Sequence, residues 1–153
     1  MLQESFNRVY TKFKLNFYRS VMGRFQKREA SMTTVEVFCS EIIQAMGRPT
    51  VNEFASFVGI SPSNAAYKVN SLIQKGYLKK EQSEDDKREY HLAVTQKYFD
   101  YYNISYNYLA TVTERIQARF SPEEVVKLEE MLDIVSSELM PEIPLKNPHG
   151  PMG

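Results

Sequence analysis

One face of the helix expected after Ser61 carries mostly short, polar and uncharged side chains. A helix in the DNA major groove needs such groups, because they reach base edges and phosphates without a bulky clash. Asn64 and Asn70 suit adenine, Ala66 suits a thymine methyl group and Lys68 suits a phosphate. An ordinary solvated face is the alternative. The predicted DNA-binding residues of this stretch are Ser61, Ser63, Asn64, Ala66, Tyr67, Lys68 and Asn70, and Ser71 shares their face.

A polar loop, Glu81 to Glu89, carries a second charged group: Asp86, Lys87 and Arg88. The segments before and after it, Tyr77–Lys80 and Tyr90–Thr95, read as two strands of a hairpin. Arg88 at the tip suits a narrow minor groove, where the potential is most negative. Asp86 is placed to fix the guanidinium by a charge-assisted bond. All three residues belong to the predicted DNA-binding set, although a charged hairpin tip is by itself usually just solvated.

Caps and glycines mark the elements that must position these side chains. Thr50 and Glu53 predict a capping box for a short helix that ends at Gly59. A Ser-Pro pair begins the next helix and Gly76 ends it. Two helices joined by a short turn with glycine indicate a helix-turn-helix, and the hairpin adds a wing.

Amphipathic helices are expected on both sides of this stretch. Apolar side chains recur every three or four residues from Leu2 to Val21, and again after the Ser121-Pro122 start. Gln96 to Phe120 has no breaker and predicts one long helix. These apolar stripes must be buried, and the simplest way is packing against each other and against a second copy of the chain. The alternative is a monomer with a thick helical core. A twofold dimer would present two recognition helices about 34 Å apart, one turn of DNA.

The motif-bearing half of the chain resembles the multiple-antibiotic-resistance regulator (MarR) family. The resemblance rests on Val51-x-x-Phe54-Ala55, Gly59-Ile60-Ser61-Pro62-Ser63-Asn64, Leu72-x-x-x-Gly76-Tyr77-Leu78 and Asp85-Asp86-Lys87-Arg88-x-x-x-Leu92-x-Val94-Thr95. It implies a bacterial homodimeric transcription regulator, often a repressor released by a small molecule. The implied fold is mainly α with a small β-hairpin wing. It is one domain over 1–140, with a winged helix-turn-helix over about 33–95 and dimerisation helices over about 2–22 and 96–140.

Aromatic residues gather in the first helix and after the hairpin. The resembling family binds anionic aromatic or lipophilic effectors in a crevice between the dimerisation helices and the DNA-binding lobe. Here the resemblance implies a pocket drawn from Tyr10, Phe13, Phe17, Arg19, Phe38, Tyr98 and Tyr102. The alternative is simple packing of the same side chains in a core or an interface.

Composition narrows the class of protein. The chain of 153 residues has 19 Lys and Arg against 19 Asp and Glu, but residues 1–30 are basic and residues 96–153 acidic. A local basic patch is enough to meet phosphates. The single cysteine, Cys39, favours a reducing cytoplasm, and its apolar and acidic neighbours do not favour a redox sensor. Residues 141–153, rich in proline, predict a flexible tail.

Other classes of function find less support in the sequence. No cluster with metal-ligand spacing, cofactor motif or nucleophile–base pair is apparent, so we expect no metal, no cofactor and no enzyme. A winged-helix module for protein–protein interaction without DNA would need an apolar recognition face, whereas the observed face is polar. The basic aromatic first helix is also compatible with binding to a membrane surface, although no segment is long enough to span one.

Overall fold

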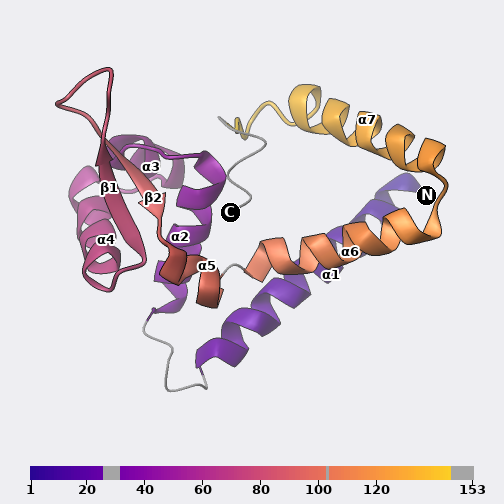
Figure 1. The fold of residues 1–153 in the computed structure, drawn as a ribbon, viewed down its shortest axis with the longest axis horizontal. Helices are drawn as coiled ribbons and strands as arrows, with labels where there is room; N and C mark the ends of the chain where they lie inside the picture. Colours follow the sequence, from indigo (N-terminus) through magenta and orange to yellow (C-terminus); the bar gives the residue numbers. More distant parts are fainter. Residues whose placement is uncertain (26–31, 103, 146–153) are drawn as a thin grey trace. The chain divides into compact units, whose positions relative to one another are not determined.

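A computed structural model describes residues 1–25, 32–102 and 104–145 of the chain (Figure 1). These residues form two compact units. The helical unit consists of residues 1–20 and 104–144, and the winged-helix unit consists of the described part of 21–103. The elements run in the order α1 (Leu2–Phe25), α2 (Thr34–Met46), α3 (Val51–Val58), α4 (Pro62–Gln74), β1 (Leu78–Gln82), β2 (Tyr90–Val94), α5 (Gln96–Tyr102), α6 (Ile104–Arg119) and α7 (Pro122–Glu138).

The helix-turn-helix is formed by α3 and α4, as the caps predict. Thr50 and Glu53 close a capping box on α3, and Gly59 ends the helix in the left-handed region with φ of 79°. The Ser61 side chain caps α4, and Gly76 follows that helix with φ of 85°. Each glycine allows the chain to turn where a side chain would strain the backbone. A second capping box, formed by Thr33 and Glu36, begins α2.

The wing is an antiparallel hairpin in which Leu78 pairs with Val94 and Gln82 with Tyr90. The predicted first strand, 77–80, is wrong at its end, because β1 continues two residues further to Gln82. Backbone pairing needs no apolar side chain, so the polar residues at the end of β1 can join the ladder. The hairpin is anchored to the segment before α3, where the Leu92 N–H donates to the Pro49 carbonyl at 2.7 Å.

The core of the winged-helix unit lies where α2, α3, α4 and the hairpin meet. Its least exposed members are apolar or aromatic side chains, among them Phe54, Ala65, Val69, Leu72, Leu92 and Tyr98, each 0 % exposed. Burial of a large apolar side chain contributes about 1.5–3 kcal/mol, so this cluster holds the inner side of α4 against the rest of the unit. The opposite side of α4 is left to the solvent.

The helical unit contains α6, α7 and residues 2–20 of α1. Phe13 and Tyr108 make an edge-to-face contact with ring centroids 5.5 Å apart. The predicted single helix over 96–120 is described as two, α5 and α6, and Asn103 between them lies outside the described residues. Of the predicted tail, residues 141–145 form neither helix nor strand, and 146–153 lie outside the described residues. The single domain over 1–140 stays a prediction.

Candidate nucleic-acid interface

The outer face of α4 carries the predicted base-reading side chains. Ser63, Asn64 and Asn70 are exposed, and Tyr67 is 76 % exposed at the centre of the face. Ala66 is half-buried. The arrangement matches the expected helical face, because these residues lie opposite or beside the buried stripe of Ala65, Val69 and Leu72. Polar groups on this face are free to form hydrogen bonds with the base edges of a duplex.

Ser61 has a structural task at the start of α4. Its hydroxyl accepts a hydrogen bond from the Asn64 N–H at 3.2 Å and lies 3.3 Å from the Ser63 hydroxyl. A helix N-terminus leaves backbone N–H groups without intrahelical partners, and together with the positive end of the helix dipole these attract phosphate. Ser61 therefore fixes the N-terminal end of α4.

The wing tip holds its arginine in one direction, as expected from the sequence. Asp86 Oδ1 accepts hydrogen bonds from the Arg88 backbone N–H at 3.0 Å and from Arg88 Nε at 3.2 Å. Asp86 Oδ2 accepts from Arg88 Nη2 at 3.3 Å. These bonds to Arg88 hold the pKa of the Asp86 carboxyl below its usual range. Lys87 beside them is exposed.

The flank of α4 that faces α2 differs from the expected solvent-facing surface. Ser71, assigned by its spacing to the DNA-reading face, instead donates a hydrogen bond from its hydroxyl to Glu36 Oε2 at 3.1 Å. The spacing predicted the wrong neighbour because this flank borders both solvent and α2. Lys68 lies one turn earlier and is half-buried. Its charge acts to lower the pKa of the Cys39 thiol.

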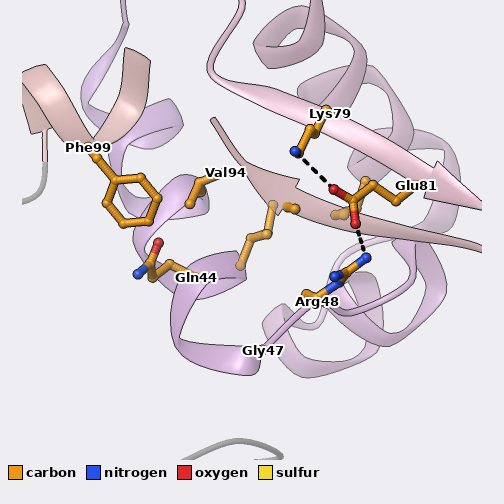
Figure 2. A pocket seen from close by; sticks show the side chains of 10 residues that line it. Gln44, Gly47, Arg48, Lys79, Glu81, Val94 and Phe99 are labelled. Carbon is orange, nitrogen blue, oxygen red and sulfur yellow. Dashed lines mark hydrogen bonds and ion pairs between the residues drawn. The ribbon is translucent and has the colours of Figure 1, made fainter. Parts of the chain in front are cut away.

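A small pocket beside the wing was missed by the sequence analysis. It has a volume of about 210 Å³ and lies between the end of α2, the hairpin and α5 (Figure 2). Lys79 and Arg48 both pair with Glu81, with Lys79 Nζ 3.0 Å from the carboxylate. No partner in the described part of the chain reaches the buried Gln44 Oε1. Sequence spacing gave no signal, because the lining residues come from separate elements: Ile43, Gln44, Gly47, Arg48, Lys79, Glu81, Leu92, Ala93, Val94 and Phe99.

The residues of the predicted effector pocket are divided between the helical unit and the winged-helix unit. Tyr10 and Arg19 are exposed on α1, whereas Phe13 and Phe17 are half-buried in the helical unit. In the winged-helix unit, Phe38 is 38 % exposed, and the buried Tyr98 donates its hydroxyl hydrogen to Glu41. The Tyr102 side chain lies outside the described residues. Because these side chains belong to two units that are each described by themselves, a shared pocket stays a prediction.

Cys39 is 5 % exposed. Burial raises the pKa of its thiol, Lys68 acts to lower it and Glu36 to raise it, and the net change is upward. A raised pKa keeps the sulfur protonated, and a protonated thiol is a poor nucleophile. Among the described residues no group of three His, Cys, Asp or Glu side chains is placed to hold a metal ion. No described helix combines the length and apolar character needed to cross a bilayer.

Comparisons with known proteins were made for the sequence and for the fold. Residues 32–90 match the model of the MarR family. No curated protein matches the chain. Among solved structures, the chain is similar to Streptococcus pneumoniae FabT in complex with DNA, at 20 % identity over 90 % of this chain and 94 % of that one, with a TM-score of 0.57.

A MarR family protein from Bacillus stearothermophilus has 14 % identity to this chain, a TM-score of 0.60, and coverage of 90 % of this chain and 92 % of that one. The transcriptional regulator Tm0710 from Thermotoga maritima has 18 % identity, a TM-score of 0.57, and coverage of 88 % and 90 %. At these identities the similarity establishes a shared fold, mainly helical with a winged helix-turn-helix, as expected from the sequence.

Proposed function

We propose that this chain, which carries a MarR family domain over residues 32–90, is a DNA-binding regulator of transcription. The observation that carries the proposal is the joint placement of two groups. The polar outer face of α4 is open to solvent, and the wing in the same unit presents an arginine held by Asp86. A recognition helix and a wing together suit adjacent major and minor grooves of one duplex.

In this proposal, affinity and sequence preference come from different side chains. Lys68, Lys87 and Arg88 meet phosphates or the minor groove and supply most of the salt-dependent affinity. Ser63, Asn64 and Ala66 meet base edges together with Tyr67 and Asn70. Ser61 acts through the helix start that it caps.

A homodimer is the proposed assembly, because the helical unit exposes many large apolar side chains. Leu2 is 84 % exposed, Phe6 56 %, Leu132 51 % and Leu139 66 %. Apolar surface on this scale marks an interaction site. A second copy related by twofold symmetry would cover it and present two recognition helices to a palindromic operator.

Repression and release by a small anionic or lipophilic effector form the finer part of the proposal. The pocket beside the wing supports it, because it offers apolar walls, two cations that share one carboxylate, and Gln44 Oε1 as an acceptor for a ligand donor (Figure 2). Such an effector releases DNA only if it binds the DNA-incompetent arrangement more tightly. A bacterial cytoplasm is the proposed location, and because MarR family proteins are transcription regulators we assign no enzymatic activity.

The test is selection of bound fragments from a random pool of duplex DNA with the purified full chain. We expect enrichment of a palindrome whose half-sites are about one helical turn, ~10 base pairs, apart. Absence of any complex in dilute buffer, where phosphate contacts are strongest, would refute the proposal. Sedimentation of the same protein with anionic lipid vesicles tests the alternative of binding to a membrane surface. That alternative predicts that the protein is found in the vesicle pellet.

A further inference from the structure

Glu36 is the one charged side chain that is buried within the described part of the chain, with an exposed fraction of 7 %. It lies in the first turn of α2 and closes the capping box with Thr33, whose N–H donates to Glu36 Oε1 at 3.1 Å. Burying a carboxylate is costly unless charged or polar partners compensate for the lost water. Capping alone does not require burial, because Glu124 closes the same box on α7 while exposed.

The partners that compensate for the burial come from α4 and from Lys75, the C-cap residue directly after it. Lys75 Nζ lies 2.7 Å from Glu36 Oε1, and the Ser71 hydroxyl donates to Glu36 Oε2 at 3.1 Å. Ser71 and Lys75 are four residues apart and therefore share one flank of the helix. Both oxygens of one carboxylate on α2 are thus joined to the C-terminal half of α4.

The contact with Glu36 adds directional bonds to the packing that holds α4. Ala65, Val69 and Leu72 are each 0 % exposed, so apolar packing resists a large rotation of α4, but it constrains a small rotation less sharply than a hydrogen bond does. Hydrogen bonds weaken steeply when their angle changes, so the bonds from Ser71 and Lys75 resist rotation of α4 about its own axis. Rotation would turn Tyr67 and Asn70 away from the base edges that they are proposed to read.

We propose that Glu36 is a positioning residue for DNA recognition, which sets the rotation of α4 through Ser71 and Lys75. The inference rests on the proposed DNA-binding function and adds a residue that itself touches no DNA. Loss of Glu36 should therefore reduce the discrimination between DNA sequences. Hydrogen bonds to base edges depend strongly on the rotation of α4, whereas the longer-range attraction to phosphates depends on it less.

The sign of the effect separates positioning from electrostatics. Glu36→Gln removes a negative charge from a DNA-binding unit, which by charge alone would strengthen binding to every duplex. If Lys75 served instead as a phosphate contact, releasing it from Glu36 would also strengthen binding. If Glu36 positions α4, Glu36→Gln should instead weaken binding, and only to the preferred sequence.

The experiment measures binding of the full-length Glu36→Gln variant by fluorescence anisotropy. Two probes are used: a duplex selected from the random pool by the wild-type protein, and a scrambled duplex of the same length and composition. We expect the dissociation constant to rise about tenfold for the selected duplex and less than about twofold for the scrambled one. Unchanged or tighter binding to the selected duplex, or an equal loss on both probes, would overturn the proposal.

Three further variants extend the test, and Ser71→Ala keeps it decisive if Glu36→Gln folds poorly. Ser71→Ala removes one hydrogen bond to the Glu36 carboxylate. It should raise the ratio of the dissociation constant for the selected duplex to that for the scrambled duplex by about threefold. Lys75→Met and the Glu36→Gln/Lys75→Met double variant complete a double-mutant cycle, in which coupled residues are non-additive. Losses that simply add would assign Lys75 an independent role and overturn the proposal.

Matched controls isolate capping and stability from positioning. Glu124→Gln removes the equivalent capping carboxylate from α7, and Val37→Ala weakens the core at α2. Neither should change the ratio of the two dissociation constants, even where the melting temperature falls. A change of that ratio with Val37→Ala equal to that with Glu36→Gln would reduce Glu36 to a stability effect.

A readout without DNA separates failure of this inference from failure of the proposed function. If the wild-type protein selects no duplex, the DNA-binding function itself fails. Amide hydrogen exchange of free protein then still tests the contact: Glu36→Gln should speed exchange in the C-terminal half of α4 more than in α3. Equal exchange in α4 of the two proteins would show that Glu36 does not restrain that helix.

Discussion

Asp86 holds both the backbone and the side chain of Arg88, since one carboxylate accepts from the Arg88 N–H, Nε and Nη2 at 3.0, 3.2 and 3.3 Å. An arginine side chain at a hairpin tip ordinarily samples many rotamers, and ordering it on binding costs free energy. Here the direction of the guanidinium is already set in the free protein.

Removing that guanidinium should weaken DNA binding. Arg88→Ala is expected to cost about 1–3 kcal/mol of affinity for the selected duplex, because it removes a contact to the groove. Lys87→Ala, which deletes the neighbouring cation, serves as the matched control and should cost less. Mobility-shift titrations of both variants give the comparison, and an Arg88→Ala affinity equal to wild type would remove the wing from the interface.

Lys68 should act on all sequences alike. Lys68→Ala is expected to weaken every duplex and to flatten the slope of log affinity against log salt by about one unit, as the loss of one phosphate contact does. Titrations at several salt concentrations on selected and scrambled duplexes provide the measurement. A loss restricted to one base position would contradict the phosphate role and place Lys68 among the base-reading side chains.

The apolar surface of the helical unit should govern assembly. Leu132→Gln combined with Leu139→Gln is expected to raise the dimer dissociation constant about tenfold or more, because burial of a leucine contributes about 1.5–3 kcal/mol. Sedimentation velocity across a series of protein concentrations measures the dimer dissociation constant. Glu129→Gln on the same helix is the control and should leave the constant unchanged. Identical sedimentation of all three proteins would argue against a dimer through α7.

Two glycines should respond to alanine with opposite signs. Gly76 has φ of 85°, and an added Cβ would meet the flexible Lys97 side chain, with Cδ at 3.6 Å and Nζ at 3.9 Å, so backbone strain is the main penalty. Gly76→Ala should lower the free energy of unfolding by about 1–3 kcal/mol. Gly23→Ala, inside α1 with no atom within 4 Å of the added Cβ, should raise it by about 0.5–1 kcal/mol. Urea denaturation of both variants checks the signs.

Acid should weaken the contact between α2 and α4. Burial acts to raise the pKa of Glu36, but hydrogen bonds from Lys75, Thr33 and Ser71 prevail and lower it. Because the native pKa is below that of the unfolded chain, this carboxylate stabilises the fold above the unfolded pKa. The contribution is lost as the pH falls through the native pKa.

The stability difference between wild type and Glu36→Gln should therefore be largest near neutral pH and shrink below about pH 4. Denaturant titrations over that range measure it, and Lys75 stays charged throughout. A difference that grows on acidification would reverse the assigned sign of the pKa shift.

Local chemistry explains why much of the fold could be predicted. The capping box of Thr50 and Glu53, the Ser61 cap and the turns at Gly59 and Gly76 involve residues that are close in the chain. Asp86 and Arg88 are only two residues apart, so their pairing was also expected. The limits of β1 were less well predicted, because backbone pairing, rather than side-chain pattern, decided where the strand ended.

The sequence by itself determined the capped starts of α3, α4 and α7, the turns, the hairpin and the chemical character of the α4 face, since each depends on contacts within a few residues. Only the tertiary structure decided which flank of α4 meets Glu36, 35 residues from Ser71 and 39 from Lys75. The same holds for Tyr98, whose partner Glu41 is 57 residues away. Helical spacing indicates which side chains share a face, but packing of the elements determines what that face meets.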